Sequence, residues 1–336
     1  DAAPDGPPVD SAPPEAGPDD AGADATPADE GPPDGAVVDA YEPPPLPFVP
    51  GPPAELFDCN AEFVDPGRRS PVPLDCVIDP ACDARMVVGH RGAGGQAGTI
   101  APENSLAGIR AALLMGVDGV ELDVRHTADD HLVLMHDGSV DRTTDGEGNV
   151  DQMTLAEVTA LHLKRPYHPD VPGDFDCETV PTLEQAFALT GGRVFIDLDT
   201  KTDRVDLVVA AIAAAGLHDE VFVSVSGVDR AVQARALDPE VRVQIRPDTP
   251  EEYASAMALF ARAPEVIEIP DVRVAEMAPS IREAGLKVFA DVFGIDAAAL
   301  LLGDLQRYVG RYDAGAHILQ SEYPPLVLEA LGRRDF

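Results

Sequence analysis

Basic side chains, long apolar runs and cysteine are all scarce in this 336-residue chain. It has 24 Lys and Arg against 60 Asp and Glu, a formal net charge of −36. That shortage of positive charge argues against a nucleic-acid partner, because phosphate backbones need a basic surface. No run of about 18 apolar residues occurs, which excludes a membrane-spanning helix. A divalent cation is the more natural partner for so acidic a chain, whose apolar residues, 45% of the total, suffice for a sizeable core.

The first 57 residues contain no Lys, Arg or His, and they carry thirteen acidic residues among many Pro, Ala and Gly. Such a segment buries too little apolar surface to offset its ordering entropy, so we interpret residues 1–57 as a disordered, self-repelling spacer. A calcium-collecting or adhesive tail is the alternative, although nothing in it repeats at a ligand-like spacing. The chain begins at Asp1 without Met, which suggests a processed, exported product. We expect an extracellular, periplasmic or surface-tethered protein, with a lipid anchor upstream of Asp1 as one means of tethering.

Only four cysteines are present: Cys59, Cys76, Cys82 and Cys177. None belongs to a Cys-x-x-Cys pair, and no His lies near them at zinc-finger spacing. In an exported protein they predict two disulfides with three open connectivities, and buried free thiols are the alternative. Three of the four lie in or beside a lead-in, residues 58–85, so at least one bridge should pin that region onto the domain.

From residue 86 onward, short β-branched runs alternate with longer runs whose apolar spacing is near 3.6. The predicted strands are 86–90, 119–124, 193–199, 220–225, 241–245, 266–269, 287–292 and 316–321. The predicted helices are 103–115, 204–215, 228–236, 250–263, 275–284 and 297–309. Eight such units in about 250 residues predict an α/β fold of the (β/α)8 TIM-barrel type over residues 86–336. A doubly wound open sheet is the alternative, but no Gly-x-Gly-x-x-Gly opens the first helix.

A ninth apolar run, 132–136, breaks this count. The few residues that separate it from the second strand are too short for a parallel crossover, so we predict a hairpin. It opens an insertion, residues 125–180, after the second strand. There, Thr154 and Glu157 predict a capping box on a short helix, 155–161, followed by a loop, 165–177. A long loop on the carboxyl face of a barrel usually shapes a substrate site.

Charged side chains gather at the ends of three predicted neighbouring strands. His90 ends the first, and two acidic pairs lie on the next two: Glu121 with Asp123, and Asp197 with Asp199. Residues two apart share one face of a strand, and carboxylates are the ligands that Mg²⁺ and Ca²⁺ prefer. Simple salt bridges are the alternative, with these partners: Arg91, Arg125 and Lys201. Strand-end clustering favours a metal site.

Several motifs follow one another in an order that resembles the glycerophosphodiester phosphodiesterases. The matching blocks are His90-Arg91-Gly92, Ala101-Pro102-Glu103-Asn104-Ser105, Val120-Glu121-Leu122-Asp123-Val124, Met135-His136-Asp137, Pro181-Thr182-Leu183-Glu184 and Ser321-Glu322-Tyr323-Pro324. The resemblance covers residues 87–331. Several blocks in order are far more specific than any one of them.

The resemblance implies a TIM barrel that cleaves glycerophosphodiester-type phosphodiesters, giving an alcohol and a phosphomonoester, with a divalent metal, Ca²⁺ or Mg²⁺. It also assigns roles to individual residues. The acid/base pair would be His90 and His136, the metal ligands Glu121, Asp123 and Asp197, and the phosphate contact Arg91. Glu103 would stand at the metal or orient His90.

Three departures from the family pattern concern the site. Asp197 stands where a Glu is usual, which shortens its reach by one methylene. Asp199 stands where a phosphate-facing Lys is usual, and Lys201 has the parity to reach the same face, where it would contact substrate. The strand at residues 287–293 lacks the usual Trp and Asn, which bears on recognition of a glycerol-type headgroup.

Two other functions stay open at this point. One is a phospholipase D-like lipid phosphodiesterase that forms a cyclic phosphate, from a related barrel group that also uses two histidines and three carboxylates. The other is a surface-displayed binding module that keeps the fold without turnover, which the charge of Asp199 favours. Both histidines and the full carboxylate set favour the enzyme.

Overall fold

The computed structural model describes residues 47–93, 95, 100–166, 168 and 170–336. Most of the predicted spacer, residues 1–57, lies outside these residues. In its described part, Ala54–Leu56 form a short 3-10 helix, η1, and Phe57 packs against Phe175 with ring centroids 6.1 Å apart. Ala54 and Phe57, at the end of the predicted spacer, are therefore part of the folded core.

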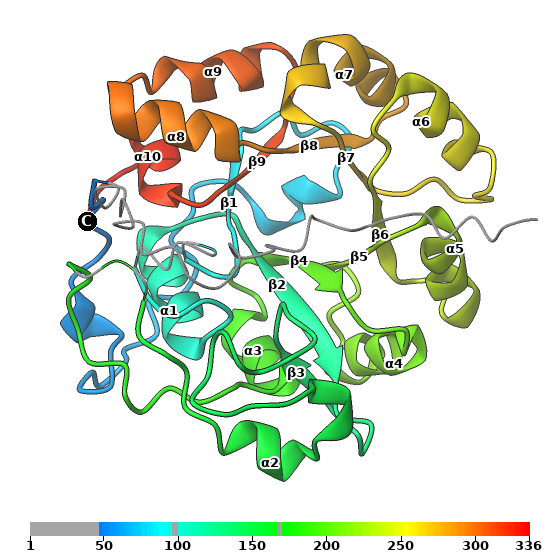
Figure 1. The fold of residues 1–336 in the computed structure, drawn as a ribbon. Coiled ribbons are helices and arrows are strands. Elements are labelled where there is room, and N and C mark those ends of the chain that lie inside the picture. The colour runs from blue at the N-terminus through cyan, green and yellow to red at the C-terminus, as the bar shows by residue number, and fades with distance from the viewer. Residues whose placement is uncertain (1–46, 94, 96–99, 167, 169) are drawn as a thin grey trace, which may run out of the picture. The chain divides into compact units, whose positions relative to one another are not determined.

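Nine strands form one sheet in the described residues, and eight of them close into a parallel barrel (Figure 1). The barrel strands are β1 (Met86–Gly89), β2 (Gly119–His126), β4 (Phe195–Thr200), β5 (Val221–Val225), β6 (Arg242–Ile245), β7 (Val266–Glu268), β8 (Lys287–Asp291) and β9 (Ile318–Ser321). β1 pairs with β2 on one side and with β9 on the other, which closes the ring. The predicted (β/α)8 barrel is confirmed.

The predicted hairpin is also present. β3 (Leu132–Leu134) pairs antiparallel with β2, and the insertion continues through η3 (Val150–Gln152) and α2 (Leu155–Thr159). α2 begins with the predicted capping box, in which the Thr154 hydroxyl accepts from Glu157 N and the Glu157 carboxylate accepts from Thr154 N. Both features follow from local sequence, which explains why they were predictable.

Helices cover the outside of the barrel in Figure 1. They are α1 (Leu106–Met115), α3 (Leu183–Thr190), α4 (Val205–Ala215), α5 (Val228–Leu237), α6 (Pro250–Met257), α7 (Val274–Glu283), α8 (Phe293–Leu302), α9 (Gln306–Asp313) and α10 (Pro324–Ala330), with a 3-10 turn η4 (Asp271–Arg273) before α7. The predicted helix at 297–309 is two helices, because Gly303 takes the left-handed conformation, φ 67°, at the end of α8. The helix predicted at 250–263 ends earlier, at Met257.

The interior of the barrel changes from apolar to polar along the strands. At the amino end, one apolar cluster includes Phe195 of β4, Phe222 of β5 and Phe289 of β8. Gly119 of β2 makes room for this layer, because a Cβ there would lie 2.4 Å from the Phe195 ring. Toward the carboxyl ends, the same inner faces carry carboxylates and amides, since alternate residues of a strand point to one side. The candidate site therefore sits above an apolar floor.

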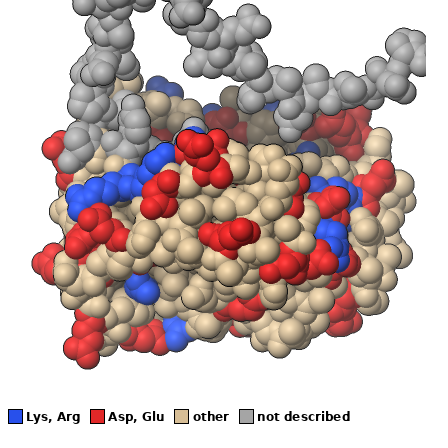
Figure 2. All heavy atoms as spheres, turned by 60° about the horizontal axis from the view of Figure 1, so that its bottom comes forward, with Lys and Arg blue, Asp and Glu red and all other residues tan. Residues whose placement is uncertain are grey.

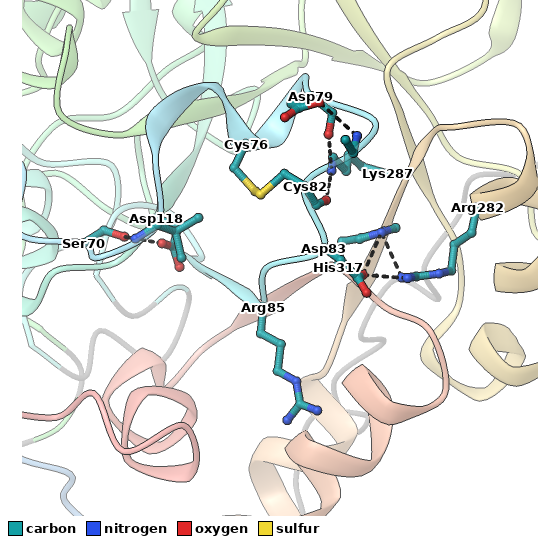
Figure 3. Close-up of a disulfide and its surroundings, with 12 residues drawn as sticks. Ser70, Cys76, Asp79, Cys82, Asp83, Arg85, Asp118, Arg282, Lys287 and His317 are labelled. Carbon is teal, nitrogen blue, oxygen red and sulfur yellow. Dashed lines mark hydrogen bonds and ion pairs between the residues drawn. A yellow bond between two sulfur atoms is a disulfide. The ribbon is translucent and has the colours of Figure 1, made fainter.

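A disulfide-closed segment covers the amino end of the barrel (Figure 3). It contains η2 (Leu74–Val77), and Cys76 and Val77 pack in the apolar cluster with Met86. Cys76 is bonded to Cys82, and the Lys287 ammonium donates to the main-chain carbonyls of Asp79 and Cys82.

The second disulfide joins Cys59 to Cys177, 118 residues apart. It pins the predicted lead-in onto the end of the insertion, as at least one bridge was expected to do. No described helix is long and apolar enough to cross a membrane. On the face drawn in Figure 2, acidic side chains are spread over the surface with basic ones among them.

Candidate active site

Two neighbouring strands present the acidic pairs at the carboxyl end of the barrel. β2 and β4 pair in parallel with Glu121 opposite Asp197 and Asp123 opposite Asp199. All four side chains are buried. Four carboxyl groups on adjacent inner faces lie close together in a setting where unpaired charge is costly.

The carboxylates that cluster most closely differ from the predicted ligand set in one member. Oxygen atoms of Glu121, Asp123 and Asp199 all lie within 4.8 Å of one another. Asp197 is outside that group, and its Oδ2 accepts a hydrogen bond from Gln244 Nε2 at 2.9 Å. The geometry therefore favours Asp199, which stands where the family has a Lys, over Asp197 as third ligand, and the ligand role of Asp197 stays a prediction.

The acidic cluster fits a hard divalent cation. All three clustered residues offer oxygen, the ligand type of Mg²⁺ and Ca²⁺. Asp199 Oδ1 and Asp197 Oδ1 are buried and have no hydrogen-bond partner among the described residues. Buried carboxylate oxygens are normally partnered, so these two atoms have room for a ligand bond.

Burial and mutual repulsion change the acidity of these groups in different directions. Burial, with the charges of Asp123 and Asp199, raises the pKa of Glu121 well above its ordinary value. Burial also raises the pKa of Asp197 to about 8. For Asp199, burial would raise the pKa, but Arg246 and Lys201 hold it below its ordinary value. The charged form of Asp199 is therefore favoured.

Two cations offset the charge of Asp199. Lys201 Nζ lies 2.7 Å from Asp199 Oδ2 and 3.6 Å from Asp123 Oδ1. Arg246, which follows β6, donates from Nη1 to Asp199 Oδ2 at 3.1 Å. Lys201 thus reaches the inner face as predicted, but its described contacts are to carboxylates of the site.

His90 and Arg91 lie directly after β1, where the backbone is constrained. Arg91 has φ 50°, a left-handed conformation that is unusual outside glycine, and its N–H donates to Glu121 Oε2 at 2.8 Å. Gly89 permits the turn, because a Cβ there would lie 2.1 Å from Gly92 O. Strain of this kind persists where surrounding contacts hold it, often at functional sites. Here it aims a backbone donor and two side chains at the carboxylate cluster.

His90 is held from two sides. Its Nδ1 lies 2.6 Å from Glu322 Oε1, and its ring packs on Phe293 with centroids 4.8 Å apart. Its Nε2 lies 3.7 Å from Glu121 Oε2, so it faces the carboxylate cluster. Glu322 is therefore the carboxylate that orients His90 in the described structure, whereas Glu103, expected at the metal or beside His90, pairs with Arg91 and Arg142.

A chain of ion pairs connects Arg91 to His136. Arg91 Nη1 donates to Glu103 Oε1 at 2.9 Å, and both Glu103 oxygens accept from Arg142 of the insertion at 2.8 Å. Arg142 also donates to Asp137, whose Oδ1 lies 2.7 Å from His136 Nδ1. The insertion thereby places its histidine relative to the loop after β1.

The main chain fixes His136 further. Met135 N donates to Asp123 O at 3.0 Å, so the next residue, His136, begins beside the carboxyl end of β2. Arg125 donates from Nε and Nη2 to His136 O at 2.9 and 2.8 Å. His136 therefore belongs to the same end of the barrel as His90 and the acidic cluster.

Several residues that complete the site were given no role from sequence. Asn104 donates to Asp123 Oδ2 at 2.9 Å, and its own Oδ1 accepts from Asp123 N at 3.0 Å. The others are Glu322, Arg142, Gln244, Arg246 and Phe293. Asn104 and Glu322 lie inside recognised motifs, which was an available signal. Gln244 and Arg246 lie on β6 and just after it, outside the recognised motifs, and only the closed barrel brings them to the site.

Comparison with known proteins gives a match to a family model and to several relatives. Residues 90–293 match the model of the glycerophosphoryl diester phosphodiesterase family. A glycerophosphodiester phosphodiesterase of Caldanaerobacter subterraneus is 40% identical over 111 residues, which are 33% of this chain and 42% of that protein. The human glycerophosphodiester phosphodiesterase 1 is 40% identical over 118 residues, 32% of this chain and 34% of that protein. The chain thus aligns with less than half the length of these relatives.

Solved structures extend the similarity over the barrel. A glycerophosphodiester phosphodiesterase from Agrobacterium tumefaciens superimposes with a TM-score of 0.59 at 25% identity, over 72% of this chain and 98% of that one. A phosphodiesterase from Oleispira antarctica, solved in complex with the product sn-glycerol-3-phosphate, gives a TM-score of 0.60 at 25% identity, over 74% and 97%.

Proposed function

Because this chain belongs to the glycerophosphoryl diester phosphodiesterase family, we propose that it hydrolyses a phosphodiester of the glycerophosphodiester type to an alcohol and a phosphomonoester. The observation that carries the proposal is the buried cluster of Glu121, Asp123 and Asp199 with His90 Nε2 at its edge, 3.7 Å from Glu121. A small-molecule substrate is consistent with the relative that was solved with sn-glycerol-3-phosphate.

Glu121, Asp123 and Asp199 would hold a divalent cation, Ca²⁺ or Mg²⁺, with Asp197 as a further predicted ligand. When bound, such a cation offsets the charge that grows on the phosphoryl oxygens. Lys201 and Arg246 keep Asp199 ionised, the form that a cation requires.

The two histidines are the proposed proton-transfer groups. His90 Nδ1 is engaged by Glu322 and His136 Nδ1 by Asp137, which leaves each Nε2 for proton transfer. One histidine takes the proton of the nucleophile, and the other gives a proton to the leaving alkoxide. The nucleophile is either water, which would give a phosphomonoester, or a neighbouring substrate hydroxyl, which would give a cyclic phosphate.

Arg91 is the proposed phosphate contact. Its guanidinium is held by Glu103 at 2.9 Å and lies 3.5 Å from Asp123 Oδ2, so it borders the acidic cluster. Phosphate recognition by a positioned guanidinium is common, because its planar donors match phosphate oxygens. Arg142 contacts both Glu103 and Asp137, so it is a positioning residue for Arg91 and for His136.

A binding module without turnover was favoured only by the charge of Asp199 beside a phosphate. Lys201 and Arg246 offset that charge in the fold, so the enzyme is the better proposal. We also propose that residues 86–336 carry the activity, with 58–85 as a lead-in and the part of residues 1–57 that precedes η1 as a spacer. The two disulfides support an exported protein in an oxidising compartment.

The test is hydrolysis of bis(p-nitrophenyl) phosphate by chelated protein, before and after addition of Ca²⁺ or Mg²⁺. We expect activity with one cation and little without, and Glu121→Gln should lower it by about 100-fold or more. Glu283→Gln, on an exposed carboxyl group of α7, is the matched control and should keep full activity. Equal turnover with chelator and with either cation would contradict the proposed metal requirement. Phosphorus NMR of the products distinguishes a monoester from a cyclic phosphate.

A further inference from the structure

A cavity of about 540 Å³ lies beside the candidate active site. It is lined by the end of β2, by the segment after β4 and by the insertion, including Arg125, Lys201 and Asp151. Lys201 Nζ is 2.7 Å from Asp199, and Arg125 lies two residues beyond Asp123 on the same face of β2. The cavity therefore adjoins the place where the phosphodiester would react.

Specific hydrogen bonds hold the wall between the cavity and the site in place. Arg125 donates to the main-chain carbonyl of His136 from two nitrogens, at 2.9 and 2.8 Å, and to that of Lys201 at 3.3 Å. One guanidinium thus ties the insertion to the segment after β4. A group held against this wall would have a fixed position relative to His136.

The residues that line the cavity disfavour three classes of group in the alcohol part of the substrate, which leaves when the phosphodiester is cleaved. A quaternary ammonium such as choline is bound by aromatic rings, and the lining contains no Phe or Tyr among the described residues. An acyl chain needs apolar walls, whereas Val150 is the one large apolar side chain in the described lining. A second charged group would meet side chains of its own sign: Asp151 and Asp203 if it is an anion, Arg125 and Lys201 if it is a primary ammonium.

The remaining class is a neutral alcohol with several hydroxyl groups. Hydroxyls both donate and accept, so they suit a lining that mixes Arg125 and Lys201 with Asp151, Asp203 and Asn149. Asn149 and Asp151 are exposed, and Asn149 makes no capping hydrogen bond although it precedes η3. Resting on the function proposed above, we propose that this cavity binds the alcohol part of the substrate and that this alcohol is a neutral polyol.

The test compares kcat/KM for three substrates: glycerophosphoglycerol, glycerophosphocholine and bis(p-nitrophenyl) phosphate. In Asp151→Ala and in Asn149→Ala, we expect kcat/KM for glycerophosphoglycerol, divided by that for the chromogenic diester, to fall about tenfold, mainly through KM. Glu283→Ala, which removes an exposed carboxyl group outside the lining, should leave that ratio unchanged.

Two outcomes would overturn the inference while the proposed function stands. An unchanged ratio in both variants would mean that the cavity does not bind the alcohol, and an equal loss for glycerophosphocholine would mean that the ligand class is wrong. Wild-type protein that hydrolyses none of the three diesters would instead refute the proposed function itself. Melting temperatures of all variants confirm that they are folded.

Discussion

Both ends of the barrel bury aspartate, but they differ in whether each carboxylate oxygen has a hydrogen-bond partner. At the amino end, Asp118 is fully buried and accepts hydrogen bonds from the Ser70 hydroxyl, from Val87 N at 2.7 Å and from two nitrogens of Arg333 at 2.8 and 3.1 Å (Figure 3 includes Ser70 and Asp118). At the carboxyl end, Asp197 and Asp199 are just as buried, and each keeps one oxygen without a partner among the described residues.

The contrast extends to the other buried acceptor oxygens. In the described part of the chain, every buried acceptor oxygen without a partner lies at the carboxyl end of the barrel strands: Asp197 Oδ1, Asp199 Oδ1, Asp291 Oδ1 and Gln320 Oε1. The buried Lys287 at the amino end has two carbonyl partners. A buried charge costs several kcal/mol unless it is paired. The amino end therefore pairs its buried carboxylate within the protein, whereas the carboxyl end leaves carboxylate oxygens to pair with a ligand.

Asp118→Ala should give the largest effect, because it leaves Arg333 buried without its carboxylate. We expect a loss of about 3–5 kcal/mol in the free energy of unfolding, measured with urea. At the other end, Glu121→Gln in chelated protein should lose far less or gain stability, since it removes one of several carboxylates that repel each other. Similar losses at the two ends would contradict the comparison.

His317, at the amino end, should make stability depend on pH. Burial, with the nearby charges of Arg282 and Lys287, lowers its pKa to about 4. The unfolded chain, with an ordinary pKa near 6.5, then binds the proton first, so stability is full above pH 6.5 and falls between pH 6.5 and 4. The loss should reach about 3 kcal/mol.

Substitution by Gln should remove that part of the pH dependence. The measurement is urea unfolding of wild-type and His317→Gln protein at a series of pH values. Parallel stability curves for the two proteins across this range would show that His317 does not contribute.

At the carboxyl end, the expected loss is of activity rather than stability. His90→Ala and His136→Ala should each lower kcat by about 100-fold or more, equivalent to about 2.7 kcal/mol, with an unchanged melting temperature. His218→Ala is the matched control, because His218 pairs with Asp238 away from the site. Near-normal turnover in either of the first two variants removes that histidine from the mechanism.

The smallest expected effect is stabilisation by the cation. At ten times its Kd, Ca²⁺ or Mg²⁺ should add about 1.4 kcal/mol to the free energy of unfolding of chelated protein. Differential scanning fluorimetry would then record a rise of about 2 °C.

The same experiment decides between the two candidates for third ligand. The stabilisation by cation should disappear in Asp123→Asn and Asp199→Asn and persist in Asp197→Asn, if Asp199 is the ligand that the geometry favours. Loss of the stabilisation in Asp197→Asn, with its persistence in Asp199→Asn, would instead identify Asp197 as the third ligand.

Local sequence was enough to predict most of the fold. Strands and helices were visible as apolar runs, the hairpin as a short connection, and α2 as a capping box. α3 has the same signal, since Thr182 and Gln185 form a capping box, and it was overlooked. The split between α8 and α9 depends on one residue, Gly303, at the end of a helix that is otherwise continuous in pattern.

The candidate site was predicted as far as motifs contain it. The choice between Asp197 and Asp199 was not predictable, because both share one face of β4 and Gln244, 47 residues beyond Asp197, engages one of them. Glu103 was expected at the metal or beside His90, and the contact of His90 with Glu322 was not foreseen for a similar reason, since the two residues are 232 apart in sequence. Contacts that exist only when the barrel closes leave no local pattern.

The Cys59–Cys177 bridge has a consequence for limited proteolysis. β1, β2, β3 and most of the insertion lie between these two cysteines, so one covalent loop contains His90, Glu121, Asp123 and His136. A protease that cuts once at an exposed position of the insertion, such as Arg165, would leave the two fragments joined. The nicked chain would migrate as one species until a reductant is added, and both histidines would stay on the same covalently linked body.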